Sequence, residues 1–260
     1  MISIIIQQLI LGIIQGITEW LPLSSSGMTT IVMVNFFNIT DISVLLHQAL
    51  FLHLGTFLAA LIYFKKEVRS ILSFKKKTRK VLTFLLISTI ITGIIGVLLM
   101  KLLIGNSLEL TGKTITFVIG FFLLITGGMQ LASRKKGLKT EKDIKKRDSI
   151  LPGMAQGFAV LPGISRSGIT TSTLLLKKFN DTSALRLSFL MSLPIVLFGN
   201  LFLNLPDITK TFTLASLAGL FTAFIFGILT IHILMKLSKR INFAWFAIIF
   251  AILMMVGVLF

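Results

Sequence analysis

Long apolar stretches alternate along the chain with short segments rich in lysine and arginine. A helix needs roughly 20 predominantly apolar residues to cross a bilayer. Six stretches reach this length or come close to it, and the pattern predicts a spanning helix in each. They are Val44–Phe64, Val81–Ile104, Thr114–Ala132, Ser183–Leu205, Phe212–Met235 and Phe243–Phe260. The expected fold class is therefore an all-α integral membrane protein.

Two further apolar segments, Ile2–Val34 and Ile150–Leu176, are interrupted. Each contains a Leu-Pro pair, several glycines and a serine-rich turn. A straight spanning helix would not carry this combination, because a proline or a turn leaves backbone groups without hydrogen-bond partners in the bilayer. The pattern predicts a helix–turn–helix element in each segment.

The basic residues predict the orientation of these elements. They gather after the first, third and fifth predicted spans, and the intervening loops hold only Lys101, Lys113 and Lys210. The positive-inside rule places the basic groups in the cytoplasm. These groups are Lys65, Lys66, Arg69, Lys75, Lys76, Lys77, Arg79 and Lys80; Arg134, Lys135, Lys136, Lys139, Lys142, Lys145, Lys146 and Arg147; and Lys236, Lys239 and Arg240.

With the basic groups inside, the first span would enter from the outside. Ile150–Leu176 begins after a cytoplasmic loop and is followed by Lys177, Lys178 and Arg186. Each interrupted segment must then enter and leave on its own side of the membrane. We therefore expect two re-entrant elements, one from each face, with both termini outside.

Composition supports a membrane protein and removes several kinds of chemistry. Of the 260 residues, 55% are hydrophobic and 13% are charged, whereas soluble domains carry about 25% charged residues. The chain has no cysteine, which excludes disulfides and thiolate metal sites. The net charge of +17 is attributed to topology and to contact with anionic membrane lipids rather than to nucleic-acid binding.

The two interrupted segments resemble each other. Shifting the sequence by 141 residues gives eight identities in the 19 positions from Gly12 to Thr30. The matched residues are Gly12, Gln15, Gly16, Ser24, Ser26, Gly27, Thr29 and Thr30, which fall on Gly153, Gln156, Gly157, Ser165, Ser167, Gly168, Thr170 and Thr171.

This repeat predicts two halves in one transmembrane domain. Residues 1–132 and 150–260 would each hold one re-entrant element and three spans, joined by a basic cytoplasmic loop, 133–149. Because three spans are an odd number, the second half would be inverted relative to the first. Inverted repeats place their sites near the midplane, where broken helices from both halves meet. We expect the two serine-rich turns to face each other there.

Glu19 and Arg166 are the main candidates for chemistry, because few ionisable residues lie within the apolar segments. A charge at bilayer depth costs about 2.5–3.5 kcal/mol on insertion scales and marks a functional site by default. One interpretation is a structural ion pair that joins the two halves. The other is an anion site in which Arg166 binds an oxyanion. The hydroxyls of the two turns favour the anion site.

Both turns have the composition of a phosphate-binding turn. Glycines and serines that open a helix present backbone N–H groups and the positive end of the helix dipole, and serine hydroxyls add donors or a nucleophile. The alternative is ordinary N-capping by serine. The residues concerned are Ser24, Ser25, Ser26 and Gly27 in the first turn, and Ser165, Arg166, Ser167 and Gly168 in the second.

Gln15 and Glu19 lie four residues apart and so share one helix face. Carboxylate and amide oxygens are hard ligands suited to Mg²⁺ or Ca²⁺. Two ligands are too few for a complete site, so the phosphates of a substrate would have to complete the coordination shell. His53 lies among small residues and is a further candidate for substrate binding or proton transfer.

Two stretches of sequence carry a resemblance to a known family. Gln15-Gly-Ile-Thr-Glu-Trp-Leu-Pro-Leu-Ser-Ser-Ser-Gly27 and Pro162-Gly-Ile-Ser-Arg-Ser-Gly-Ile-Thr170 resemble the two signatures of the undecaprenyl-diphosphatase (bacitracin-resistance) family. The resemblance covers the whole chain in length, number of spans and order of motifs. It implies hydrolysis of undecaprenyl diphosphate to the monophosphate, which recycles the lipid carrier of cell-wall precursors. It also implies a plasma-membrane protein that needs a divalent cation, with an inverted-repeat fold and an outward-facing site.

The same resemblance implies roles for single residues. Glu19 and Gln15 match the element associated with metal binding and catalysis, and Ser25 matches the serine proposed as nucleophile or phosphate ligand. Arg166, flanked by Ser165 and Ser167, matches the arginine that grips the diphosphate. Thr170 matches the last hydroxyl of the second signature, and the remaining turn residues would bind substrate.

Met28 departs from the family pattern, which usually has a catalytic histidine at this position. A methionine can neither transfer a proton nor act as a nucleophile, so three outcomes are open. His53 or Glu19 could take over the proton transfer; the protein could bind the lipid diphosphate without hydrolysing it; or it could be a flippase or anion transporter. Hydrolysis is the favoured interpretation.

Overall fold

The computed structural model describes residues 3–75, 78–105, 112–133, 137–203, 212–237 and 243–258. Within these ranges the chain is all-helical, with eleven α-helices, two short 3-10 helices and a single isolated β-bridge. Five helices are long and apolar enough to cross a membrane. They are α3 (Ile42–Tyr63), α5 (Arg79–Gly105), α6 (Gly112–Ala132), α9 (Asp181–Leu203) and α11 (Leu214–Leu237).

These five helices match five of the six predicted spans. The sixth, α12 (Phe243–Gly257), has 15 residues and is too short to count as a span by length. The ends of two predictions, at residues 204–205 and 259–260, lie outside the described residues.

Both interrupted segments are helix–turn–helix elements, as predicted. The first consists of α1 (Ile4–Thr18) and α2 (Ser25–Phe37), and the second of α7 (Ile150–Phe158) and α8 (Arg166–Leu176). A backbone hydrogen bond joins the segments that flank the second element. Lys139, before α7, and Lys178, after α8, are joined by an N–H to carbonyl bond of 2.9 Å.

One part of the prediction was wrong: the first basic group is not a loop. Lys65, Lys66 and Arg69 lie on a helix, α4 (Lys65–Leu72). Phe64, Val68 and Ile71 are spaced by four and three residues and face the core, so an amphipathic helix forms despite the charges.

The linker 133–149 also contains regular secondary structure. The 3-10 helices η1 (Glu141–Asp143) and η2 (Lys146–Ser149) lie within it. The basic residues of the three groups that fall outside the described residues are Lys76, Lys77, Arg134, Lys135, Lys136, Lys239 and Arg240, and Lys210 lies outside them as well.

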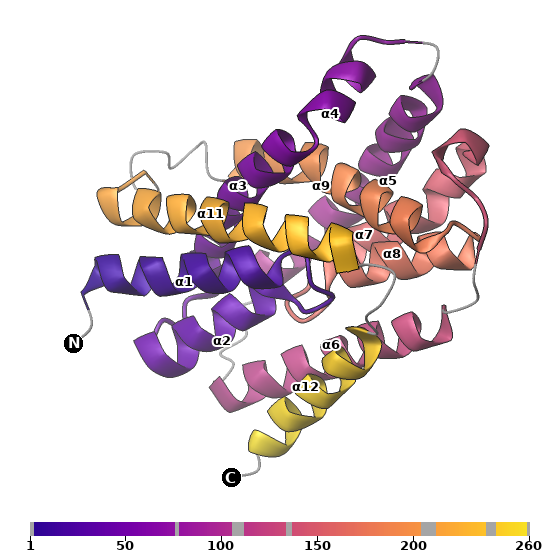
Figure 1. Ribbon diagram of the computed structural model, residues 1–260. Coiled ribbons are helices and arrows are strands. Elements are labelled where there is room, and N and C mark those ends of the chain that lie inside the picture. Colours follow the sequence, from indigo (N-terminus) through magenta and orange to yellow (C-terminus); the bar gives the residue numbers. More distant parts are fainter. Residues whose placement is uncertain are drawn as a thin grey trace.

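The helices pack in pairs through small residues (Figure 1). α1 lies along α11, which also packs on α3, while α7 packs on α5 and α6 on α12. A side chain added at Gly12 of α1 would meet the Gly219 carbonyl of α11, and one at Gly55 of α3 would meet that of Leu220. Glycine thus allows these backbones to approach closely.

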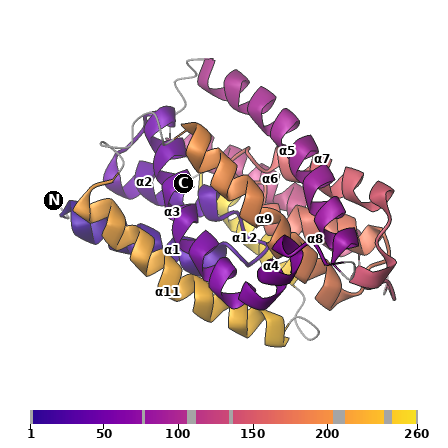
Figure 2. The ribbon, with the colours of Figure 1, turned by 90° about the horizontal axis from the view of Figure 1, so that it is seen from above.

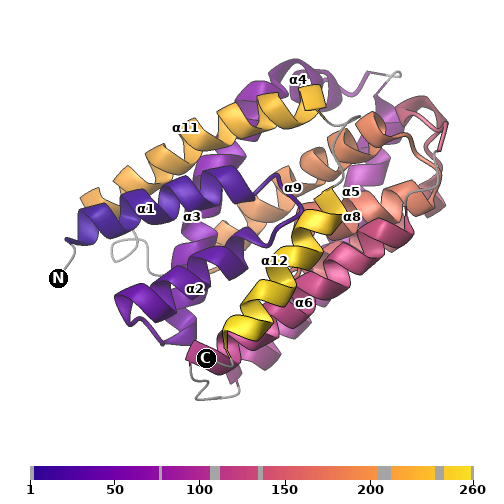
Figure 3. The same ribbon diagram turned by 60° about the horizontal axis from the view of Figure 1, so that its bottom comes forward.

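Viewed from above, α11 and α5 lie on opposite edges of the molecule, with α3 and α9 between them (Figure 2). Both turns of the helix–turn–helix elements hold buried residues, among them Ser24 in the first and Ser165 in the second. The N- and C-terminal ends of the chain lie toward one end of the helices, and α4 lies toward the other (Figure 3). The largest apolar cluster includes Trp20, Phe64, Phe84 and Phe189 and packs beside the two turns.

Candidate active site

Glu19 and Arg166 form a direct ion pair between the two helix–turn–helix elements. Glu19 is the C-cap of α1, where its N–H donates to the Gln15 carbonyl, and Arg166 is the first residue of α8. Arg166 Nη2 donates to Glu19 Oε1. The Glu19 side chain is only 3% exposed and that of Arg166 13%. The two candidates that the sequence singled out therefore meet in the interior.

The second carboxylate oxygen of Glu19 is surrounded by further polar groups. Oε2 accepts hydrogen bonds from Ser25 Oγ at 2.6 Å and Gln15 Nε2 at 2.9 Å, and His53 Nε2 lies 3.1 Å away. His53 Nδ1 lies 2.6 Å from the Ala49 carbonyl. Because a carbonyl only accepts, Nδ1 carries the hydrogen in that contact. Gln15, Ser25 and His53 thus all contact Glu19, and of these contacts only that of Gln15 was predicted from the sequence.

Two groups that the sequence analysis missed hold the guanidinium of Arg166. Nη1 donates to the Ser188 carbonyl at 3.3 Å, and the guanidinium carbon lies 5.7 Å from the centre of the Trp20 ring, within cation–π range. Trp20 could have been found from its place next to Glu19. No pattern pointed to Ser188, because its backbone carbonyl makes the contact.

The two serine-rich turns contact each other, as expected. The Gly163 N–H donates to Ser24 Oγ at 3.0 Å, and Ser167 Oγ donates to the Leu21 carbonyl at 2.8 Å. Gly163 has a φ of +103°, which L side chains rarely adopt. A glycine is therefore required where the second turn approaches the first.

The capping interpretation is confirmed for one serine in each turn. Ser24 Oγ accepts from the Gly27 N–H, and Ser165 Oγ from the Gly168 N–H, both at 3.2 Å. These two N–H groups are therefore already engaged. Ser26 lies 3.3 Å from Ser24, hydroxyl to hydroxyl.

Thr170 lies behind the second turn. Its hydroxyl is fully buried and donates to the Arg166 carbonyl at 2.7 Å. It also lies 2.6 Å from the Ser188 hydroxyl. Thr170 thus connects Arg166 to α9, and its contacts support the arginine rather than line a cavity.

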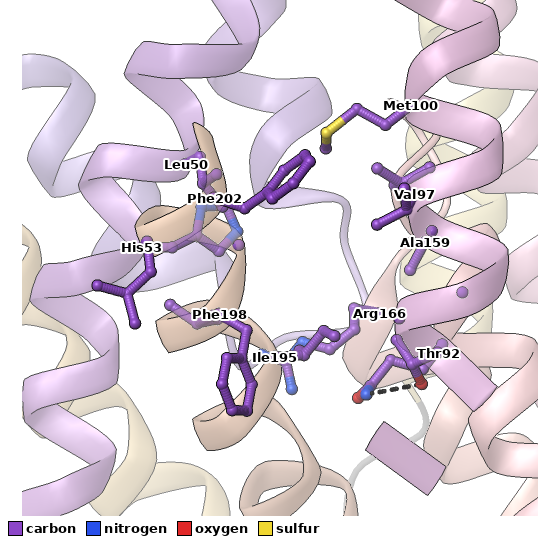
Figure 4. A pocket seen from close by; sticks show the side chains of 18 residues that line it. Leu50, His53, Thr92, Val97, Met100, Ala159, Arg166, Ile195, Phe198 and Phe202 are labelled. Atoms are coloured by element: carbon purple, nitrogen blue, oxygen red, sulfur yellow. Dashed lines mark hydrogen bonds between the residues drawn. The ribbon is translucent and has the colours of Figure 1, made fainter. Parts of the chain in front are cut away.

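A cavity of about 500 Å³ is lined in part by Arg166 of the ion pair, and Figure 4 shows this residue among the lining side chains. Its polar lining consists of His53, Thr92, Gln156 and Arg166. Gln156 is the repeat counterpart of Gln15, a signal that could have identified it. The other lining residues are apolar or glycine and come from α3, α5, α9 and the α7 region: Leu50, Gly93, Gly96, Val97, Met100, Gly157, Ala159, Val160, Ile195, Val196, Phe198, Gly199, Leu201 and Phe202.

The donor set suits a cation that shares its shell with a ligand. The described residues contain no cluster of three or more histidines and carboxylates that could hold a metal alone. However, Gln15 Oε1 is buried and has no hydrogen-bond partner among them, and it lies on the residue that contacts Glu19. An amide and a carboxylate oxygen fit Mg²⁺ or Ca²⁺ if phosphate oxygens supply the rest.

Comparison with known proteins gives one consistent result. The family model described as bacitracin resistance protein BacA matches residues 8–257. A protein of Methanococcoides burtonii named undecaprenyl-diphosphatase is 43% identical over 253 residues, covering 93% of this chain and 94% of that protein. Proteins with the same name from Methanothrix thermoacetophila and Haloarcula marismortui are 36% and 34% identical, with 93% or more of each chain covered.

Proposed function

The chain belongs to the family described as bacitracin resistance protein BacA, and from that membership we propose that it hydrolyses undecaprenyl or another polyprenyl diphosphate to the monophosphate and phosphate. The relatives carry the name of this activity. The structural observation that supports it best is the buried Glu19–Arg166 contact between two serine-rich turns, beside a mainly apolar cavity. The arginine suits the phosphate end of such a substrate, and the apolar cavity suits its lipid end.

Hydrolysis of a phosphoanhydride depends mainly on charge neutralisation and in-line positioning. Arg166 would bind the phosphate oxygens. Ser25 donates to Glu19 at 2.6 Å, which is the arrangement of a nucleophile and its base. Attack on the terminal phosphorus breaks its bond to the bridging oxygen, which leaves with the prenyl monophosphate. Water then releases the phosphate from Ser25.

His53 would supply the imidazole that position 28 lacks. Its Nε2 lies 3.1 Å from Glu19 Oε2, and it lines the cavity together with Arg166. An imidazole in this place can exchange a proton with the carboxylate and with an oxygen of the substrate. The methionine at position 28 is therefore compatible with hydrolysis.

A divalent cation would be held by Glu19 and Gln15 Oε1 together with the diphosphate. When bound, it would neutralise charge on the phosphate oxygens. The orphaned amide oxygen of Gln15 supports this assignment.

The topology that we propose is an inverted repeat in the plasma membrane, with α1–α2 and α7–α8 as re-entrant elements and α12 as a sixth, short span. The two halves are residues 1–132 and 150–260, joined by the basic linker 133–149. The equivalent caps of α2 and α8 by Ser24 and Ser165 support it. So does the equivalent packing of α1 on α11 and of α7 on α5.

We infer the orientation from the placement of the basic helix. α4 lies at the end of the molecule away from the termini. With α4 in the cytoplasm, both termini would be outside.

The experiment that tests this function is phosphate release from a prenyl diphosphate by the detergent-purified protein with Mg²⁺ or Ca²⁺ present. We expect turnover in the wild type. Movement of labelled lipid across liposomes without phosphate release would instead indicate a flippase. The relatives named above are not called flippases or transporters, and no contact of the described residues favours that alternative.

A further inference from the structure

Arg166, the proposed phosphate ligand, already has an anionic partner. Its Nη2 is paired with Glu19 Oε1, and both side chains are largely buried. A phosphate that approaches this guanidinium meets the carboxylate at short range, and two anions on one cation repel each other at low dielectric. Glu19 and the ligand are therefore competitors for Arg166.

Glu19 can leave Arg166 without becoming an unpaired buried charge. Only Oε1 contacts the guanidinium, whereas Oε2 accepts from Ser25 and Gln15 and lies beside His53. Loss of one partner is costly when it leaves a buried charge uncompensated. Here three polar groups remain beside Oε2, so the exchange costs little free energy.

The guanidinium is also held by contacts that do not involve the Glu19 carboxylate. The Ser188 carbonyl accepts from Nη1 at 3.3 Å, and the Trp20 ring covers one side. Trp20 is itself fixed, being 1% exposed and packed edge-to-face on Phe189 with ring centres 4.8 Å apart. These contacts can persist while Nη2 changes its partner.

We propose that the terminal phosphate of the diphosphate binds by replacing Glu19 on Arg166, and that Trp20 is a positioning residue that holds the guanidinium during this exchange. The identity of the ligand rests on the proposed function. The exchange also gives Glu19 a second role. Once released from Arg166, its carboxylate can act as the base for Ser25 and as a ligand of the cation.

One consequence runs against the usual expectation for a catalytic carboxylate. Glu19→Gln removes the competing charge, so this variant binds the ligand more tightly although it does not turn over. Typical coupling between two sites changes affinity by about 5–150-fold. We expect at least a fivefold gain for this direct competition.

The test is calorimetric titration of the purified, full-length protein with inorganic diphosphate, in the presence of a chelator so that no cation bridges Glu19 and the ligand. Glu19→Gln is expected to bind at least about fivefold more tightly than wild type. Trp20→Leu is expected to bind about tenfold more weakly and Trp20→Phe to recover most of the loss, since phenylalanine keeps an aromatic face. The same change at the exposed second tryptophan, Trp245→Leu, is the matched control.

A double-variant cycle separates positioning from a structural role. In Arg166→Ala, addition of Trp20→Leu should change diphosphate affinity no further. Equal or weaker binding by Glu19→Gln, or the same loss from Trp20→Leu with and without Arg166, would overturn the proposal.

Tryptophan emission tests the proposal without changing the site, so it remains usable if the site variants misfold. In Trp245→Phe protein, Trp20 is the single tryptophan, and saturating diphosphate should shift its emission. An unchanged emission would contradict exchange beside this ring. Wild-type hydrolysis is measured separately, so failure of the exchange and failure of the function are distinguishable.

Discussion

Glu19 and Arg166 lie 147 positions apart in the sequence and form a buried ion pair between the end of α1 and the start of α8. Such a pair is a weak source of stability, because desolvation offsets most of the attraction. The ion pair matters here because of where its two side chains lie. Without ligand it joins a carboxylate that lies beside the Ser25 hydroxyl to an arginine that lies beside the apolar cavity, and the proposed hydrolysis uses both groups.

His53 is predicted to replace the histidine that position 28 lacks. His53→Asn removes the imidazole beside Glu19 and should reduce phosphate release about 10²–10⁴-fold, the usual contribution of a proton-transfer group. Met28→His in the same protein should restore part of the loss. Steady-state turnover of the single and double variants checks this. Full activity in His53→Asn would contradict the assignment.

The cavity is predicted to accommodate the prenyl chain. Gly93 has open space where a side chain would begin, and at Gly96 the nearest atom is 4.0 Å away. The Cβ of a leucine at either position would meet no neighbour closer than 4.0 Å, and the rest of its side chain is expected to take up cavity volume. We expect kcat/KM for a long prenyl diphosphate to fall about tenfold, the scale of a few buried methylenes.

Inorganic diphosphate should bind these two variants as it binds wild type, because it needs no apolar cavity. Gly128→Leu on α6 is the matched control, since this glycine also faces open space but does not line the cavity. An equal effect of Gly128→Leu would show that the loss is unrelated to the cavity.

Removal of divalent cations should abolish hydrolysis. With Glu19 and Gln15 as its proposed protein ligands, the cation is held mainly through the substrate, and a chelator should compete effectively. Gln15→Leu should raise the cation concentration needed for half-maximal activity about 10–100-fold, the usual effect of a supporting ligand. Activity that survives exhaustive chelation would exclude a role for the cation in hydrolysis.

Close packing of α1 on α11 should make Gly12 sensitive to substitution. A methyl group at Gly12 would meet the Gly219 carbonyl and lie 2.9 Å from Thr222 Cβ. Overpacking of this kind costs about 1–3 kcal/mol, so Gly12→Ala should unfold at lower temperature in detergent. Gly128→Ala should not, and a shift of equal size there would argue against the packing explanation.

The sequence predicted the parts of the site that depend on local spacing or on charge in an apolar segment. Gln15 and Glu19 share a helix face through their four-residue spacing, and Glu19 and Arg166 stand out because charges are costly in a bilayer. Gln15 does contact Glu19, and Glu19 and Arg166 form the ion pair of the first interpretation, while the anion site stays a prediction. The apolar spacing at α4 was overlooked, because the basic residues of this segment drew attention to a loop.

Contacts that arise only from packing could not be predicted. The Ser188 carbonyl reaches Arg166 because α9 crosses α8, and any residue at position 188 would offer a carbonyl. Thr92 lines the cavity because α7 packs on α5. Such positions have no distinguishing residue type, so only the fold reveals them.

The central claim is tested most directly by phosphate release from a prenyl diphosphate, measured side by side for wild type, Glu19→Gln and Arg166→Ala at matched thermal stability. The account predicts turnover by wild type and a loss of at least about 10²–10³-fold in each variant, the scale of removing one group that stabilises charge in the transition state. No phosphate release by folded wild-type protein with Mg²⁺ or Ca²⁺, or undiminished release by either variant, would contradict it.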